Sequence, residues 1–400
     1  MTRISDNIQQ VMPPEIALLA ACAHTHLTNA HKQEISRLLV AGLDWDTVIS
    51  NAIYHKVIPL LHRTLTHHFK DETPEKVAAK INVHLKRSVL QTFAISAALI
   101  KVTRLLTENN IDVLPVKGAL LSQKLYNSPT MRTYTDVDIL VRQEDLIGAL
   151  NLLQENGYKL LPEGIAQSTY LKFLKYYHHG RLLDKNGILI ELHWELSGFY
   201  APTPMTLNSI VPFLTKTEFN NYPTLDLTDE MLFIFLCLHG NKHNWAKLDY
   251  ISSLAELIRI TPNLDWPVIL DLGKKLKMQK RILLALLLAD KLFSTAIPEQ
   301  IEDMRARHPG VDRLADTLIA NEISRNTEDS TMHPIKKIIM YQPLIMDGKL
   351  DAARFIIRSL VVPEHEIWHT TRLPDALFPL YFLDKPYRAL TMPIRKMLQP

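Results

Sequence analysis

The sequence predicts an α/β protein in which helical regions precede and follow a small mixed sheet. Apolar residues recur at helical spacing over the first 108 residues and again after about residue 200. Between these regions, short β-rich runs alternate with helical segments, and Asn186-Gly187 is typical of a hairpin turn. We therefore expect a helical region over 1–108, an α/β core over 109–200, and a mainly helical region over 201–400.

The α/β core begins with a compact apolar run at 111–116, which predicts a strand. Lys117-Gly118 follows it, and 119–126 then reads as a short helix. The β-rich run 137–141 predicts a second strand. An amphipathic pattern over 144–156 predicts a longer helix.

That helix should end at Gly157, which stands where a C-cap glycine belongs. Residues 188–194 then predict a strand after the hairpin turn. Prolines at 202, 204, 212 and 223 mark a loop-rich junction. Beyond it, the nearly all-apolar run 231–239 predicts a buried helix, with further helices at 254–260 and 282–292.

Composition is that of an ordinary globular protein, with 47% hydrophobic and 22% charged residues. The formal net charge of +3 is too small to argue for long nucleic acid, although it does not exclude tRNA. Cys22 and Cys237 form no CxxC pair, which favours a reducing compartment. No uninterrupted apolar run reaches the roughly 18–20 residues of a membrane span. We expect a cytoplasmic protein without such a span.

Two aspartates carry the main chemical signal. On a strand, Asp136 and Asp138 project from the same face, while Val137 and Ile139 point to the other. Adjacent like charges repel each other, and a hard cation such as Mg²⁺ relieves that repulsion while keeping positions open for phosphate oxygens. Taken alone, the pair also fits a solvated strand end.

The turn before the short helix could hold a phosphate. Gly118 would let backbone N–H groups approach an anion at the helix N-terminus, and Lys117 would add a positive charge. Without this context, Lys117 would read as an ordinary surface lysine.

A third carboxylate lies on the predicted strand 188–194. By alternation, Glu191, His193 and Glu195 share one face. In two-metal phosphoryl transfer, a third carboxylate holds the ion that activates the attacking hydroxyl, or accepts its proton. The alternative for Glu191 is a cross-strand ion pair. His193 and Glu195 are weaker candidates, expected to be supporting or exposed, and His193 is also a candidate for substrate contact.

In this order, the motifs resemble the DNA polymerase beta-like nucleotidyltransferase superfamily, and more narrowly a bacterial branch labelled nucleotidyltransferase family proteins. The matching stretches are 116–121, 131–141, 152–158, 190–194 and 238–245. Lys117-Gly118 stands where the superfamily carries a Gly-Ser pair, which is a departure from the wider pattern.

The resemblance implies an enzyme that transfers a nucleoside monophosphate from an NTP, such as ATP, to an acceptor hydroxyl. It implies two Mg²⁺ ions as cofactors. The catalytic metal ligands would be Asp136, Asp138 and Glu191, and the nucleotide-binding residues would be Lys117, Gly118 and Arg132. The acceptor is not specified by the sequence.

Several alternatives stay open. Arg132 would hold a phosphate bidentately or lie on the surface as an ordinary arginine. His239 and His243 share a helix face, and would pack, contact substrate, or bind zinc in a hydrolase. The segment around His178-His179 is either a phosphate- or base-contacting loop or an exposed segment. The whole chain could also be a catalytically inactive interaction module with the same fold.

Overall fold

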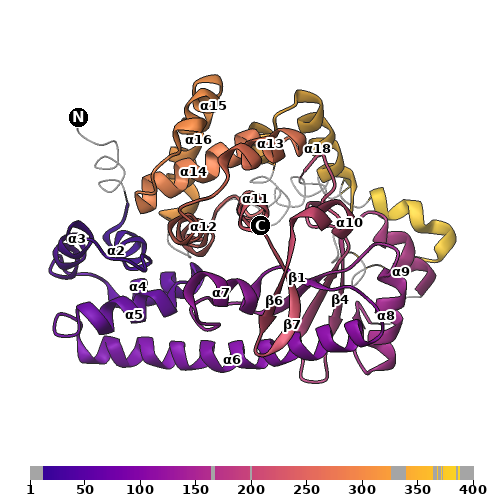
Figure 1. Cartoon of the computed structure of the whole chain (residues 1–400), viewed down its shortest axis with the longest axis horizontal. Coiled ribbons are helices and arrows are strands. Elements are labelled where there is room, and N and C mark those ends of the chain that lie inside the picture. The colour runs from indigo at the N-terminus through magenta and orange to yellow at the C-terminus, as the bar shows by residue number, and fades with distance from the viewer. Residues whose placement is uncertain are drawn as a thin grey trace, which may run out of the picture.

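The computed structural model describes residues 12–163, 167–198, 201–325 and 339–363, together with part of 367–387. A five-stranded sheet lies among helices that precede and follow it in the chain (Figure 1). The mixed α/β fold class predicted from the sequence is confirmed.

The described part of the N-terminal region is helical. Asp44 starts one helix by accepting hydrogen bonds from the backbone N–H groups of Asp46 and Thr47. The first four helices gather at one end of the molecule, and α6 runs beneath most of its length (Figure 1). α6 extends for 34 residues because no Gly or Pro interrupts it. The helices are α2 (Pro14–Cys22), α3 (Asn29–Leu39), α4 (Trp45–Tyr54), α5 (Ile58–His68) and α6 (Glu75–Glu108).

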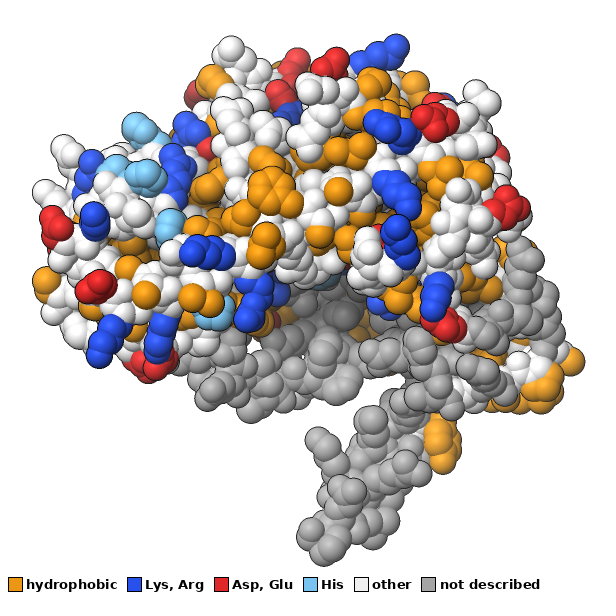
Figure 2. Space-filling view, turned by 90° about the horizontal axis from the view of Figure 1, so that it is seen from below, with side chains coloured by type: hydrophobic (Ala, Val, Ile, Leu, Met, Phe, Trp, Pro, Cys, Tyr) orange, Lys and Arg blue, Asp and Glu red, His pale blue; other side chains and the backbone are white. Residues whose placement is uncertain are grey.

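α6 has a buried face and an exposed face. Leu99 and Val102 pack into the core beneath the sheet, whereas Val83, Leu90 and Phe93 are 59%, 71% and 56% exposed. Figure 2 shows the exposed side, where apolar side chains gather between lysines and arginines. Among the described helices, α6 alone is long and apolar enough to cross a membrane by length and composition. Charged residues interrupt its apolar sequence, so no uninterrupted apolar run marked it. Its apolar window is 44% buried inside the protein, and a helix that packs on a protein core passes the same test of length and composition.

The sheet has the order β1-β2-β5-β4-β3. β2 and β5 run parallel, and the chain that connects them returns to the same end of the sheet before β5 begins. All other neighbouring strands in this sheet are antiparallel. The hairpin predicted at Asn186-Gly187 joins β4 to β5, and Gly187 adopts the left-handed φ of +79° that this turn requires. The strands are β1 (Leu114–Pro115), β2 (Asp136–Leu140), β3 (Lys159–Leu161), β4 (His179–Leu183) and β5 (Leu189–His193).

One face of the sheet is apolar. Val137, Ile139, Ile190 and Leu192 form a buried cluster with side chains of α6 and the crossover helices. The predicted helix ends as expected at Gly157, which has a φ of +85°. The helices around β2 are α7 (Gly118–Tyr126), α8 (Leu146–Glu155) and α9 (Gln167–Leu174).

The C-terminal region begins with a hairpin that the sequence analysis missed. β6 (Leu214–Phe219) and β7 (Tyr222–Leu227) pair antiparallel where only a loop-rich junction and helices were expected. Asn220 and Asn221 both have left-handed φ values, of 50° and 61°, as a two-residue hairpin turn requires. The Asn220-Asn221 pair could have predicted this turn, but the prolines at 212 and 223 favoured a loop instead.

Helices follow the hairpin, as predicted. α11 is buried almost all round, which explains its nearly continuous apolar sequence. The helices are α10 (Leu207–Ile210), α11 (Asp229–Lys242), α12 (Leu248–Ile260), α13 (Trp266–Lys275), α14 (Gln279–Phe293), α15 (Glu302–Arg307), α16 (Gly310–Leu318) and α18 (Lys349–Val361).

Candidate active site

The strand register brings the three predicted carboxylates to one face of the sheet. In the parallel pair β2–β5, Asp138 lies directly opposite Glu191. Asp136 shares the face of Asp138 by strand alternation. This face is opposite to the apolar cluster beneath the sheet, so the carboxylates converge on a polar patch.

The turn between β1 and α7 directs Lys117 at this patch. Lys117 is the N-cap of α7, and Gly118 follows with a φ of +62°, a conformation that favours glycine. The Lys117 ammonium lies 2.7 Å from Asp138 Oδ1. The strand-to-helix glycine turn predicted from the sequence is therefore present, with its lysine against a predicted carboxylate.

Histidines complete the patch. His193 Nε2 lies 3.0 Å from Asp138 Oδ1 and 3.5 Å from Glu191 Oε2, and His193 is only 5% exposed. His179 on β4 faces His193 across the sheet, and its Nε2 lies 3.8 Å from Glu191 Oε1. The exposed alternative for His193 is therefore wrong, and its contacts with Asp138 and Glu191 fit the supporting alternative.

The exposed alternative for the His178-His179 segment is also wrong. His178 is buried, and its ring centroid lies 4.7 Å from that of His179 and 5.9 Å from that of His193. The turn signal finds this hairpin but not its register. A two-residue turn at Asn186-Gly187 would pair Gly180 with His193, whereas the observed turn closes between Asp184 and Ile188 and pairs His179 with His193.

The carboxylates differ in their protonation behaviour. Burial raises the pKa of Asp138, but Lys117 and His193 outweigh burial and hold that pKa well below its usual value. Glu191 is buried too, yet His193 and His179 lower its pKa to about 2. Burial and the neighbouring Asp138 raise the pKa of Asp136. Three close acidic groups beside one lysine leave an excess of negative charge, which a divalent cation would neutralise.

α11 contributes the other basic groups. Lys242 Nζ lies 3.1 Å from His178 Nε2, and burial together with Lys117 lowers the pKa of Lys242 to about 8. No motif in the sequence distinguishes this lysine from a surface residue. His239 and His243 lie on the same helix end with ring centroids 4.8 Å apart, and burial lowers the pKa of both.

The described residues include two groups with metal-ligand spacing. One is Asp138, Glu191 and His193, and the other is His178, His179 and His193. Neither group contains His239 or His243. The zinc-hydrolase alternative therefore finds no third ligand among the described side chains.

Arg132 pairs with a carboxylate outside the predicted set. Its guanidinium is buried and donates to both oxygens of Asp249 on α12, at 3.1 Å from Nε and 2.6 Å from Nη2. The surface-arginine alternative is wrong. Glu195 lies beyond the end of β5 and accepts a 2.5 Å hydrogen bond from Ser197.

A cavity of about 370 Å³ adjoins the patch through Gly198. Tyr177, Trp194 and Arg358 line it. Gly198 packs so closely on His178 that a Cβ there would lie 2.6 Å from His178 Nδ1. The cavity thus begins one side chain away from the histidines of the site.

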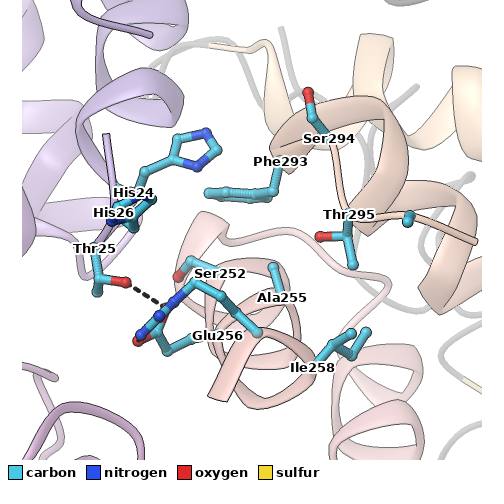
Figure 3. Close-up of a pocket in the computed structure, with 13 residues that line it drawn as sticks. His24, Thr25, His26, Ser252, Ala255, Glu256, Ile258, Phe293, Ser294 and Thr295 are labelled. Carbon is cyan, nitrogen blue, oxygen red and sulfur yellow. Dashed lines mark hydrogen bonds and ion pairs between the residues drawn. The ribbon is translucent and has the colours of Figure 1, made fainter. Parts of the chain in front are cut away.

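A second cavity, of about 250 Å³, lies between the N-terminal helices and the α12–α14 layer (Figure 3). His24 and Phe293 form part of its wall. Glu256 is already satisfied there by Thr25 at 2.5 Å and by Arg259 at 2.6 Å. None of the residues predicted for the active site lines this cavity.

The fold and the site combine a mixed sheet, a glycine turn into a helix, and carboxylates paired across adjacent parallel strands. A family model described as "Uncharacterised nucleotidyltransferase" matches residues 41–294, more than half of the chain. The chain belongs to this family. No curated protein matches the chain.

Proposed function

We propose that the protein transfers a nucleoside monophosphate from an NTP to an acceptor hydroxyl in a Mg²⁺-dependent reaction. The observation that carries this proposal is the β2–β5 register, which sets Asp138 opposite Glu191 beside the Lys117 turn. Carboxylate oxygens are the ligands that Mg²⁺ prefers, so these residues fit the ion. Family membership supports the nucleotidyltransferase class.

In the proposed reaction, the acceptor oxygen attacks the α-phosphorus in line, the hydroxyl proton passes to solvent, and the bond to the bridging oxygen of the pyrophosphate breaks. Bound Mg²⁺ would polarise the α-phosphate and stabilise the leaving pyrophosphate. Asp136 and Asp138 would hold two ions between them, and Glu191 would hold the one nearer the acceptor. A pKa of about 2 makes Glu191 a better metal ligand than proton acceptor.

Lys117 and the N-terminus of α7 would bind the triphosphate, because an ammonium and free backbone N–H groups attract anions. Arg132 is omitted from this role, since its guanidinium is bound to Asp249. The cavity beside Gly198 would admit the acceptor, and its aromatic and arginine lining fits a planar or anionic acceptor.

The test is Mg²⁺-dependent pyrophosphate release from mixed NTPs with a panel of acceptors, including sugars, peptides and tRNA. We expect release by the wild-type protein and none by the Asp136→Asn, Asp138→Asn double variant. A folded wild-type protein that binds no NTP in the presence of Mg²⁺ would instead favour the inactive interaction module.

A further inference from the structure

We propose that the centre binds a divalent transition-metal ion of the Mn²⁺ type, with the imidazole of His193 as a direct ligand beside Asp138 and Glu191. This inference rests on the metal centre of the proposed function and specifies which ion it selects. It adds a nitrogen ligand to the three carboxylates predicted from the sequence.

The first argument is the spacing of the ligand atoms. Adjacent ligands of an octahedral ion with bonds of about 2.1 Å lie about 3 Å from each other. His193 Nε2 lies 3.0 Å from Asp138 Oδ1 and 3.5 Å from Glu191 Oε2. All three ligand atoms lie within 4.8 Å of one another. One ion can therefore contact the nitrogen and both carboxylates with little side-chain movement.

The second argument is that the imidazole is held in place. His193 ends β5, where Leu140 and His179 are its register partners, and its ring lies 5.0 Å from that of His179. Nε2 is the nitrogen that faces the carboxylates. Binding of the ion at Nε2 places the ring proton on Nδ1, which is buried and has no hydrogen-bond partner among the described residues, so packing and not a hydrogen-bond acceptor orients this ring.

The third argument is ligand preference. Carboxylate oxygens suit both Mg²⁺ and Mn²⁺, but Mn²⁺, as a transition-metal ion, accepts an imidazole nitrogen more readily than the hard Mg²⁺ ion does. A set of two carboxylates and one imidazole therefore favours Mn²⁺ over Mg²⁺. Lys117 contacts the same Asp138 oxygen as His193, so an ion bound at that oxygen would release the ammonium towards a triphosphate.

Electron spin-echo measurements on Mn²⁺ bound to the full-length protein test this directly, because they detect nitrogen bonded to the ion. We expect a ¹⁴N coupling that becomes a ¹⁵N coupling when the protein is labelled with ¹⁵N-histidine. His193→Gln should remove the coupling and weaken Mn²⁺ binding by about 10- to 100-fold, while leaving Mg²⁺ binding nearly unchanged. His243→Gln, at a neighbouring buried histidine outside both ligand groups, should keep the coupling.

The isotope experiment needs no variant, so it decides the question even if His193→Gln does not fold. Mn²⁺ that binds without a histidine coupling would overturn the inference and leave the carboxylate-based function intact. A coupling that persists at full strength in folded His193→Gln would also overturn it. Conversely, a histidine coupling in a protein that releases no pyrophosphate would support the inference and count against the proposed function.

Discussion

The ion pairs Lys117–Asp138 and Arg132–Asp249 have similar short contacts but differ in the exposure of the basic residue and in the charges around it. Lys117 contacts Asp138 at 2.7 Å, and Arg132 contacts Asp249 at 2.6 Å. The Lys117 side chain is 22% exposed, whereas that of Arg132 is 8% exposed. Both aspartates are 3% exposed at the side chain, so the difference lies in the basic partner and its surroundings.

We call the Arg132–Asp249 pair closed, because its charges and hydrogen bonds are satisfied within the pair. A planar guanidinium binds both carboxylate oxygens in a fixed geometry, and charge is balanced within the pair. The Lys117 pair is open, because one ammonium faces Asp138 while Asp136 and Glu191 add further negative charge. A point charge on a flexible stem is easily displaced. We infer that the Arg132–Asp249 pair stabilises the fold. We infer that Lys117 can leave Asp138 and contact another anionic group.

The largest expected effect comes from Asp138→Asn in the open pair. We expect the rate of pyrophosphate release to fall roughly 10³-fold, because several kcal/mol of charge stabilisation in the transition state would be lost. The free energy of unfolding should fall less than in Arg132→Met, because relief of the repulsion with Asp136 and Glu191 offsets part of the lost contacts with Lys117 and His193. Steady-state kinetics and urea unfolding measure the two quantities. Activity within tenfold of wild type would remove Asp138 from the mechanism.

Arg132→Met should mainly lower stability and have little direct effect on the chemical step. It leaves the Asp249 carboxylate buried without a partner, so the free energy of unfolding should fall by about 3–5 kcal/mol. Adding Asp249→Leu should recover most of that loss, as urea unfolding of both variants would show. If Arg132→Met were normally stable but bound NTP poorly, the phosphate role predicted from the sequence would be correct.

Lys242 extends the comparison because it is a second lysine near the carboxylates that Lys117 contacts. Its pKa of about 8 predicts that kcat/KM for the NTP falls as pH rises through 8, since the ammonium that attracts the triphosphate is lost. Lys242→Arg should remove this decline. The folded pKa is below the ordinary value of 10.5, so the unfolded chain binds the extra proton between these values and stability should rise with pH there. A pH profile identical in both proteins would contradict the assignment.

The smallest expected effect concerns Gly198, which packs against His178. Gly198→Ala and Gly187→Ala both place alanine at a left-handed φ, of 54° and 79°, and each should cost about 1 kcal/mol of stability. Only Gly198→Ala brings a Cβ against His178, while Gly187 has open space. We expect activity to fall by up to about tenfold in Gly198→Ala alone. Equal activities in the two variants would separate His178 from the site.

Local chemistry determined much of what the sequence predicted. Strand alternation was enough to place Asp136 with Asp138, and Asn186-Gly187 was enough to predict the β4–β5 hairpin. The glycine turn at Gly118 followed from its position between a strand and a helix. These features depend on residues close in the chain, whose geometry is set by backbone conformation.

The tertiary structure decided which distant residues meet. Asp138 and His193 are 55 residues apart, Lys242 and His178 are 64 apart, and Arg132 and Asp249 are 117 apart. The register of two parallel strands depends on how the crossover helices pack, and no pattern within either strand encodes it. For the same reason, the partner of Arg132 and the approach of α11 to the carboxylates emerge only when the sheet and the helices pack together.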